Sequence, residues 1–166
     1  IGSDLDYWSE TKNREVMKKV AEKCYLPTNK ILLDLINEFG KAFKVSFSIS
    51  GVALDQFQMY APEVLESFQR LAHTGSVEFL SETYAHSLSA LVSEEEFKWQ
   101  VRAHTQRIED LFDQKPVVFR NTELIYSDKI GSIVHQMGFK GMLAEGSDKV
   151  LGWKSPNFGY GNAIHP

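Results

Sequence analysis

The fold is decided by residues 75–120, which read GSVEFLSETYAHSLSALVSEEEFKWQVRAHTQRIEDLFDQKPVVFR. Residues 77–80 and 116–120 are short runs rich in β-branched and aromatic side chains, as is typical of buried strands. Between them, Ser93 followed three positions later by Glu96 predicts a capping box at the start of a helix. Side chains expected on the core face of this helix recur at steps of four and three, and they are Phe97, Val101, His104, Ile108 and Leu111. A strand, a helix and a second strand predict a parallel βαβ unit with a right-handed connection.

The same alternation extends to both sides of this unit. Residues 44–49 and 141–144 predict two further strands. Helices are expected from Thr28 to Gly40, from Pro62 to Gly75 and from Ser127 to Gly138, with an earlier amphipathic helix over 14–24. Residues 152–166 show no periodicity and predict a long loop or a broken end.

Four βα units predict an α/β fold, but they are too few to close a (β/α) barrel of about 200–250 residues. We therefore expect residues 1–166 to form a single, truncated domain, one part of a larger barrel.

Composition excludes several classes of partner. The 166 residues carry a net charge of −4 and contain no basic run, which argues against a nucleic acid. No stretch approaches the roughly 18 consecutive apolar residues of a membrane span, so no membrane partner is expected. The only cysteine, Cys24, excludes an internal disulfide and a CxxC zinc site, and it favours a reducing, cytoplasmic location.

Polar side chains follow two of the predicted strands, where active sites form in parallel βα architectures. The second strand runs into 81–87 (SETYAHS), and the third runs into 120–126 (RNTELIY). Carboxylates that displace or transfer protons, together with neutral groups that hold hydroxyls, are what glycoside hydrolysis requires. The two loops therefore predict a carbohydrate-active site.

Glu123 is the strongest candidate for chemistry because it directly follows the third strand. Arg120 and Asn121 lie beside it and could keep its carboxylate ionised and aimed by charge and hydrogen bonding. The alternative is a surface glutamate that is simply paired with Arg120.

Three other residues have two interpretations each. His86 either contacts a substrate hydroxyl or a metal, or it is a loop histidine bonded to a backbone carbonyl. Glu78 lies inside the second strand and faces either solvent or a polar barrel interior, where it must be paired. Trp153 either stacks on a sugar ring or is a core or rim aromatic.

The stretch 75–86 resembles the second signature region of glycoside hydrolase family 57, and 120–128 is similar to the third. The likeness is strongest to the α-amylase-like branch and extends to 151–158. The resemblance implies an incomplete (β/α)7, TIM-like barrel of the kind shared by glycoside hydrolases and deacetylases. It implies a retaining enzyme for α-glucans or maltooligosaccharides, with no cofactor and no metal. Its implied site consists of Glu123 as nucleophile, with Glu78, His86, Arg120, Asn121 and Trp153 as substrate-binding residues.

Two parts of the family pattern are not found in this chain. The first signature is expected to precede Ile1, and the fourth, with the aspartate that acts as acid and base, is expected beyond Pro166. The resemblance therefore implies that this chain carries half of a catalytic pair.

Two rival functions stay open. Polysaccharide deacetylases share the barrel type and have a His-x-x-x-His metal motif, in which His86 would keep the second histidine while Glu82 replaces the first. The helix start at 91–96 is also similar to theirs, but their aspartate pair and their Arg-Pro-Pro-Tyr loop are not found. The other rival is a non-catalytic, carbohydrate-binding remnant.

Overall fold

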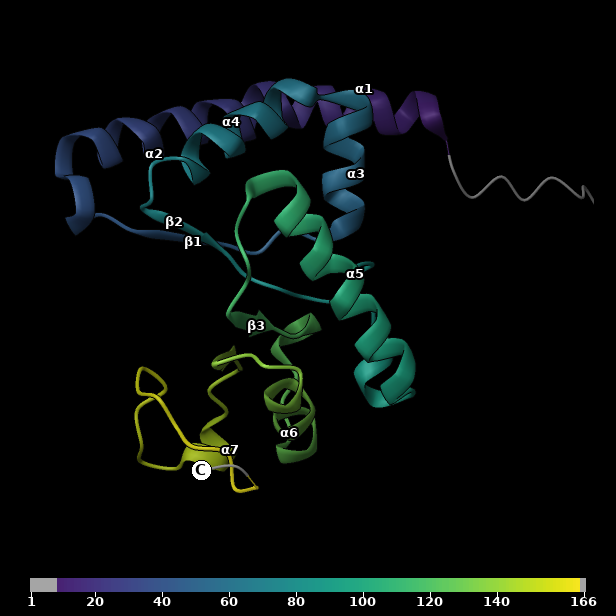
Figure 1. The fold of residues 1–166 in the computed structure, drawn as a ribbon, viewed down its shortest axis with the longest axis vertical. Helices are drawn as coiled ribbons and strands as arrows, with labels where there is room; N and C mark the ends of the chain where they lie inside the picture. The colour runs from purple at the N-terminus through teal and green to yellow at the C-terminus, as the bar shows by residue number, and fades with distance from the viewer. Residues whose placement is uncertain (1–8, 165–166) are drawn as a thin grey trace, which may run out of the picture. The chain divides into compact units, whose positions relative to one another are not determined.

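The computed structural model describes residues 9–164, which divide into two compact units (Figure 1). The first unit takes in residues 9–45 and 52–77, and the second takes in 46–51 and 78–164. None of the helices within 9–164 combines the length and the hydropathy that a membrane span requires.

The first unit opens with one continuous helical stretch. Its parts are α1 (Glu10–Val20), a π-helical segment (Ala21–Tyr25) and α2 (Leu26–Phe39), which ends at Gly40 as predicted. The predicted helix start at Thr28 is wrong, because Thr28 lies inside α2. Pro27 lies in the first turn of α2, directly after the π-helical segment. Because a π turn is wider than an α turn, the helix can continue although Pro27 lacks a backbone N–H.

Two more helices complete the first unit. α4 (Pro62–Ala72) lies alongside α2 (Figure 1), and Asn29 Nδ2 donates to Ser67 Oγ at 2.8 Å between them. α3 (Gly51–Tyr60) was not predicted, although buried Leu54, Phe57 and Ala61 have helical spacing. The ring of Phe57 packs at 5.9 Å from that of Phe68 of α4.

The four strands found within residues 9–164 fall inside the four predicted runs, each with three residues. β1 (Val45–Phe47) pairs with β2 (Val77–Phe79), and β3 (Val118–Arg120) pairs in parallel with β4 (Gly141–Leu143). An isolated parallel bridge joins Ser81, just beyond β2, to Phe119. The strand order is therefore sequential, and the carboxyl ends of β2 and β3 meet at one edge, as the parallel βα prediction requires.

Helices cover β3 in the second unit. α5 (Glu94–Phe112) is capped by Ser93, whose hydroxyl accepts from the Glu96 amide at 3.3 Å, and α6 (Asp128–Gln136) is capped by Ser127 in the same way. The reciprocal half of the capping box is not formed, because the Ser93 amide donates to the Ser89 carbonyl instead. The core of this unit consists of Phe97, Val101, Phe119, Ile130, Ile133, Val134 and Phe139.

The far end of α5 corrects one detail of the predicted core face. Phe112 is buried and stacks on Phe79 at 3.9 Å between ring centroids, whereas Leu111 is only half-buried. After the short helix α7 (Asp148–Leu151), residues 152–164 form no further helix or strand, as predicted.

Candidate active site

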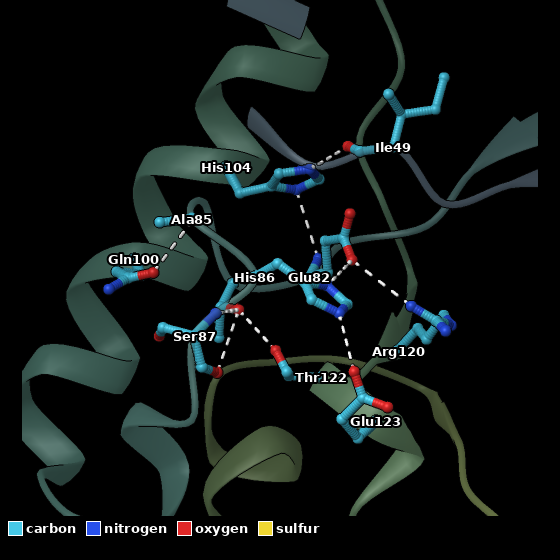
Figure 2. A network of polar contacts seen from close by, with 11 residues as sticks. Ile49, Glu82, Ala85, His86, Ser87, Gln100, His104, Arg120, Thr122 and Glu123 are labelled. Carbon is cyan, nitrogen blue, oxygen red and sulfur yellow. Dashed lines mark hydrogen bonds and ion pairs between the residues drawn. The ribbon is translucent and has the colours of Figure 1, made fainter. Parts of the chain in front are cut away.

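The loops that follow β2 and β3 carry a connected set of charged side chains (Figure 2). Glu82 is buried, and its Oε2 lies 3.6 Å from His86 Nδ1 and 3.6 Å from Arg120 Nη1. The other ring nitrogen of His86, Nε2, lies 3.3 Å from Glu123 Oε1. One imidazole therefore connects a buried carboxylate with the predicted nucleophile.

His104 fixes the backbone on which this set is built. The ring is fully buried, and its Nε2 lies 2.8 Å from the carbonyl oxygen of Ile49, so Nε2 must be the donor. Its Nδ1 accepts from the Glu82 amide at 3.3 Å, which is possible only in the neutral ring (Figure 2). Burial lowers the pKa of His104 below the ordinary histidine value, against the opposing effects of the Ile49 carbonyl and the Glu82 charge.

This lowered pKa predicts how stability depends on pH. Below the ordinary histidine pKa of about 6.5, His104 is protonated in the unfolded chain but stays neutral in the folded chain. The free energy of unfolding therefore decreases as pH falls from about 6.5 towards the lowered pKa of the folded state. We expect His104→Gln, which can still donate and accept but cannot titrate, to show a flatter decline between about pH 7.5 and pH 5. Urea denaturation of both proteins at the two pH values measures this. Equal declines would contradict it, since the other histidines are common to both.

Glu123 lies in a tight 3₁₀ turn (Thr122–Leu124) with unusual backbone angles. Glu123 has φ 54° and Leu124 has φ 56°, the left-handed region that ordinary residues avoid at a cost of order 1–3 kcal/mol each. Three bonds hold the turn: the amides of Leu124 and Ile125 donate to the carbonyls of Asn121 and Thr122, and Asn121 Nδ2 donates to the Ile125 carbonyl at 2.9 Å. A strained conformation that is enforced in this way is typical of functional sites.

The structure brings together three of the predicted site residues. The side chains of Glu123 and His86 are 72% and 43% exposed, so both can be reached from solvent. Arg120 belongs to the same network of charged side chains. The sequence predicted that its guanidinium acts on Glu123, but in the structure it pairs with Glu82. Asn121 is only 1% exposed and supports the turn; its contact with substrate stays a prediction.

Glu78 and Trp153 lie apart from this network. Glu78 is exposed on β2, and its Oε1 accepts from Ser46 Oγ at 2.6 Å. Trp153 is 93% exposed in the segment that follows α7. Their contacts with a sugar stay predictions.

The sequence interpretation missed two parts of the site. Glu82 was noted only as the residue in place of a deacetylase histidine, although it lies four positions before His86 in the same polar loop. The hydroxyls of Thr83 and Thr122 lie 2.9 Å apart and connect the two loops directly. This second contact has no signal in the sequence, because it depends on how β2 and β3 align.

The donor set does not converge on a metal. Within residues 9–164 no group of three or more His, Cys, Asp or Glu side chains is placed to hold an ion. Glu82 and Glu123 lie against opposite nitrogens of the His86 ring, so one ion bound to either nitrogen cannot also bind both carboxylates.

From this geometry we expect no stoichiometric transition metal at His86 in the purified protein. Elemental analysis, or anomalous scattering from crystals, measures it. A metal bound to His86 at one equivalent per chain would contradict the expectation and favour the deacetylase alternative.

The chain is thus an α/β protein of the TIM-like barrel type, and its carboxylates gather in the loops that follow β2 and β3. The sequence profile described as glycosyl hydrolase family 57 matches residues 3–163. The chain therefore belongs to glycosyl hydrolase family 57, as the resemblance implied.

One relative in sequence supports this assignment, and two solved structures share the fold. A Methanocaldococcus jannaschii protein named "Putative alpha-amylase" is 46% identical over 149 residues, which is 89% of this chain and 32% of that protein. The 4-α-glucanotransferase of Thermococcus litoralis has a similar structure, with a TM-score of 0.67 at 18% identity over 78% of this chain and 20% of that one. The peptidoglycan deacetylase PdaC of Bacillus subtilis shares the fold at a TM-score of 0.51 and 21% identity, over 69% of this chain and 50% of that one. The chain thus spans about a third of the M. jannaschii protein.

Proposed function

We propose that the full-length protein is a retaining glycoside hydrolase that acts on α-glucans, and that Glu123 is its nucleophile. One observation carries this proposal: an accessible carboxylate follows β3, held in a strained turn, with His86 Nε2 3.3 Å from its oxygen. Membership of family 57 and the α-amylase and 4-α-glucanotransferase names of two relatives support an α-glucan as substrate. The single cysteine, Cys24, is a free and exposed thiol, which supports the cytoplasm as location.

The proposed reaction has two displacements. In the first, an oxygen of Glu123 attacks the anomeric carbon, the glycosidic C–O bond breaks, and the leaving oxygen takes a proton from a carboxylic acid about 5–5.5 Å from Glu123. In the second, the same group, now a carboxylate, removes a proton from water or from a sugar hydroxyl, which attacks the anomeric carbon and releases Glu123. The family resemblance assigns this acid to an aspartate outside residues 1–166.

We assign the remaining predicted residues to substrate binding. We place His86 at the sugar hydroxyls next to Glu123, since both side chains are accessible and in contact. Glu78, Arg120 and Asn121 complete the polar side of the proposed site, and the exposed ring of Trp153 offers a stacking face. No cofactor takes part in this proposal.

The test is the action of the full-length protein on maltoheptaose, followed by NMR of the first products. We expect α-anomeric products, released as shorter maltooligosaccharides if water is the acceptor and as longer ones if a sugar is. Initial release of the β-anomer would exclude a retaining mechanism. Metal-dependent release of acetate from an N-acetylated glycan, with no action on maltoheptaose, would establish the deacetylase alternative. Binding of the glucan with no turnover would establish the non-catalytic one.

A further inference from the structure

We propose that Glu82 is a positioning residue, which holds His86 and, through it, the carboxylate of Glu123. This inference rests on the proposed function, because it concerns how the same nucleophile is oriented. Glu82 and Glu123 lie against opposite nitrogens of the His86 ring (Figure 2), so Glu82 acts on Glu123 only through that ring.

The carboxyl group of Glu82 is buried beside two basic side chains. Its side chain is only 3% exposed, and an ionised carboxylate in such a place must be paired. Its two partners are the guanidinium of Arg120 and the imidazole of His86, each at 3.6 Å from Oε2. The carboxylate therefore connects β3 with the loop after β2.

Hydrogen bonds hold the backbone at Glu82 and Ser81, whereas the His86 side chain is exposed. The amide of Glu82 is held by His104, and the preceding residue, Ser81, pairs with β3 through bonds of 3.0 Å to the Val118 carbonyl and 2.8 Å from the Arg120 amide. His86, by contrast, has φ 51° and a half-exposed side chain. A buried carboxylate on a fixed strand end is suited to orient an exposed ring.

The chemistry of the proposed reaction explains why such an anchor is needed. Two ionised carboxylates on opposite sides of one imidazole are both satisfied only when both ring nitrogens carry protons. When Glu123 becomes a glycosyl ester it loses its charge, and His86 loses its charged partner at Nε2. The contact between Glu82 and Nδ1 does not involve the reacting oxygen, so it can hold the ring in place for the second displacement.

The kinetic test uses four variants of the full-length protein: Glu82→Gln, Glu82→Asp, Thr105→Val and Glu123→Gln. Glu82→Gln should lower kcat by up to about 100-fold with little change in KM, because misplacement of reacting groups by about 1 Å has effects of this size. Glu82→Asp keeps the charge and should recover part of that loss. Thr105→Val is the matched control, because it removes a hydrogen bond of 3.0 Å to the neighbouring Ser81 and changes no charge. A kcat for Glu82→Gln equal to that of Thr105→Val would overturn the proposal.

A second readout does not depend on activity. The ¹⁵N chemical shifts of the His86 ring report which nitrogen carries a proton, and in the native protein we expect a proton on Nδ1. In Glu82→Gln the carboxylate beside Nδ1 becomes a neutral amide, which can either accept from or donate to Nδ1. We therefore expect the chemical shift of Nδ1 to change, and an unchanged shift would overturn the contact. Full activity in Glu123→Gln would refute the proposed function but not the contact between Glu82 and His86. The ¹⁵N shifts of His86 test that contact separately.

Discussion

Glu123→Gln is expected to lower kcat of the full-length protein by several orders of magnitude, with little change in affinity for the glucan. Glutamine keeps the shape of the side chain but cannot form the covalent intermediate, and a nucleophile acts mainly in the transition state. The side chain is 72% exposed, so its replacement should leave folding intact. Steady-state kinetics on maltoheptaose measure the effect. The control is Glu95→Gln in the first turn of α5, which removes the same charge from an exposed position outside the network of Glu82, His86, Arg120 and Glu123. Comparable kcat values for the two variants would contradict the assignment.

Two further variants distinguish nucleophilic attack from substrate binding. Glu78→Gln and His86→Ala should have milder effects on kcat and should also raise KM, because these side chains are assigned to the sugar. A loss of kcat in Glu78→Gln as large as that in Glu123→Gln would shift the assignment to Glu78.

The second large effect concerns stability. Phe119→Ala should lower the free energy of unfolding by about 3–5 kcal/mol, a large part of the roughly 5–15 kcal/mol typical of a whole protein. Phe119 is fully buried on β3, with its ring 5.6 Å from those of both Phe97 and Phe139. The same truncation at Phe158, which is 72% exposed, should have little effect and serves as the control. Urea denaturation measures both, and equal losses would show that β3 does not form the core described here.

Local signals explain why much of the fold could be predicted. The strands are short apolar runs, and α5 and α6 begin at serines whose hydroxyls accept from the amide three positions ahead. Such signals involve neighbours in the sequence. The prediction failed at Thr28, which was expected to begin a helix, because the π-helical segment before Pro27 joins α1 to α2 without a break. It also failed at α3, where Leu54, Phe57 and Ala61 give only a weak apolar stripe.

The site was predicted less completely, for a different physical reason. Glu123 and His86 were found because each lies in a polar loop after a strand. The partners of Glu82 and the bond between Thr83 and Thr122 depend on the alignment of Ser81 with Phe119 across two strands. A one-residue slip of that register would turn every side chain to the other face. Strands of three residues are too short for their apolar pattern to reveal the register.

The Glu123→Gly variant allows the role of Glu123 to be tested by chemical rescue of activity. Glu123 has a φ of 54°, which glycine adopts easily, so Glu123→Gly should keep the turn while it removes the carboxylate. Azide can then attack the anomeric carbon in place of Glu123, and we expect restored turnover with a glycosyl azide of inverted configuration as product. No rescue in a folded Glu123→Gly protein would argue against direct attack from this position.

The most direct test of Glu123 as nucleophile is labelling of the full-length protein with a mechanism-based fluorosugar, an activated fluoro-α-glucoside that traps the covalent intermediate. Proteolysis and mass spectrometry then identify the labelled peptide and residue. We predict one sugar per chain, attached to Glu123, and no label in Glu123→Gln. A label on Glu82 or Glu78, or stoichiometric labelling of Glu123→Gln, would contradict the account.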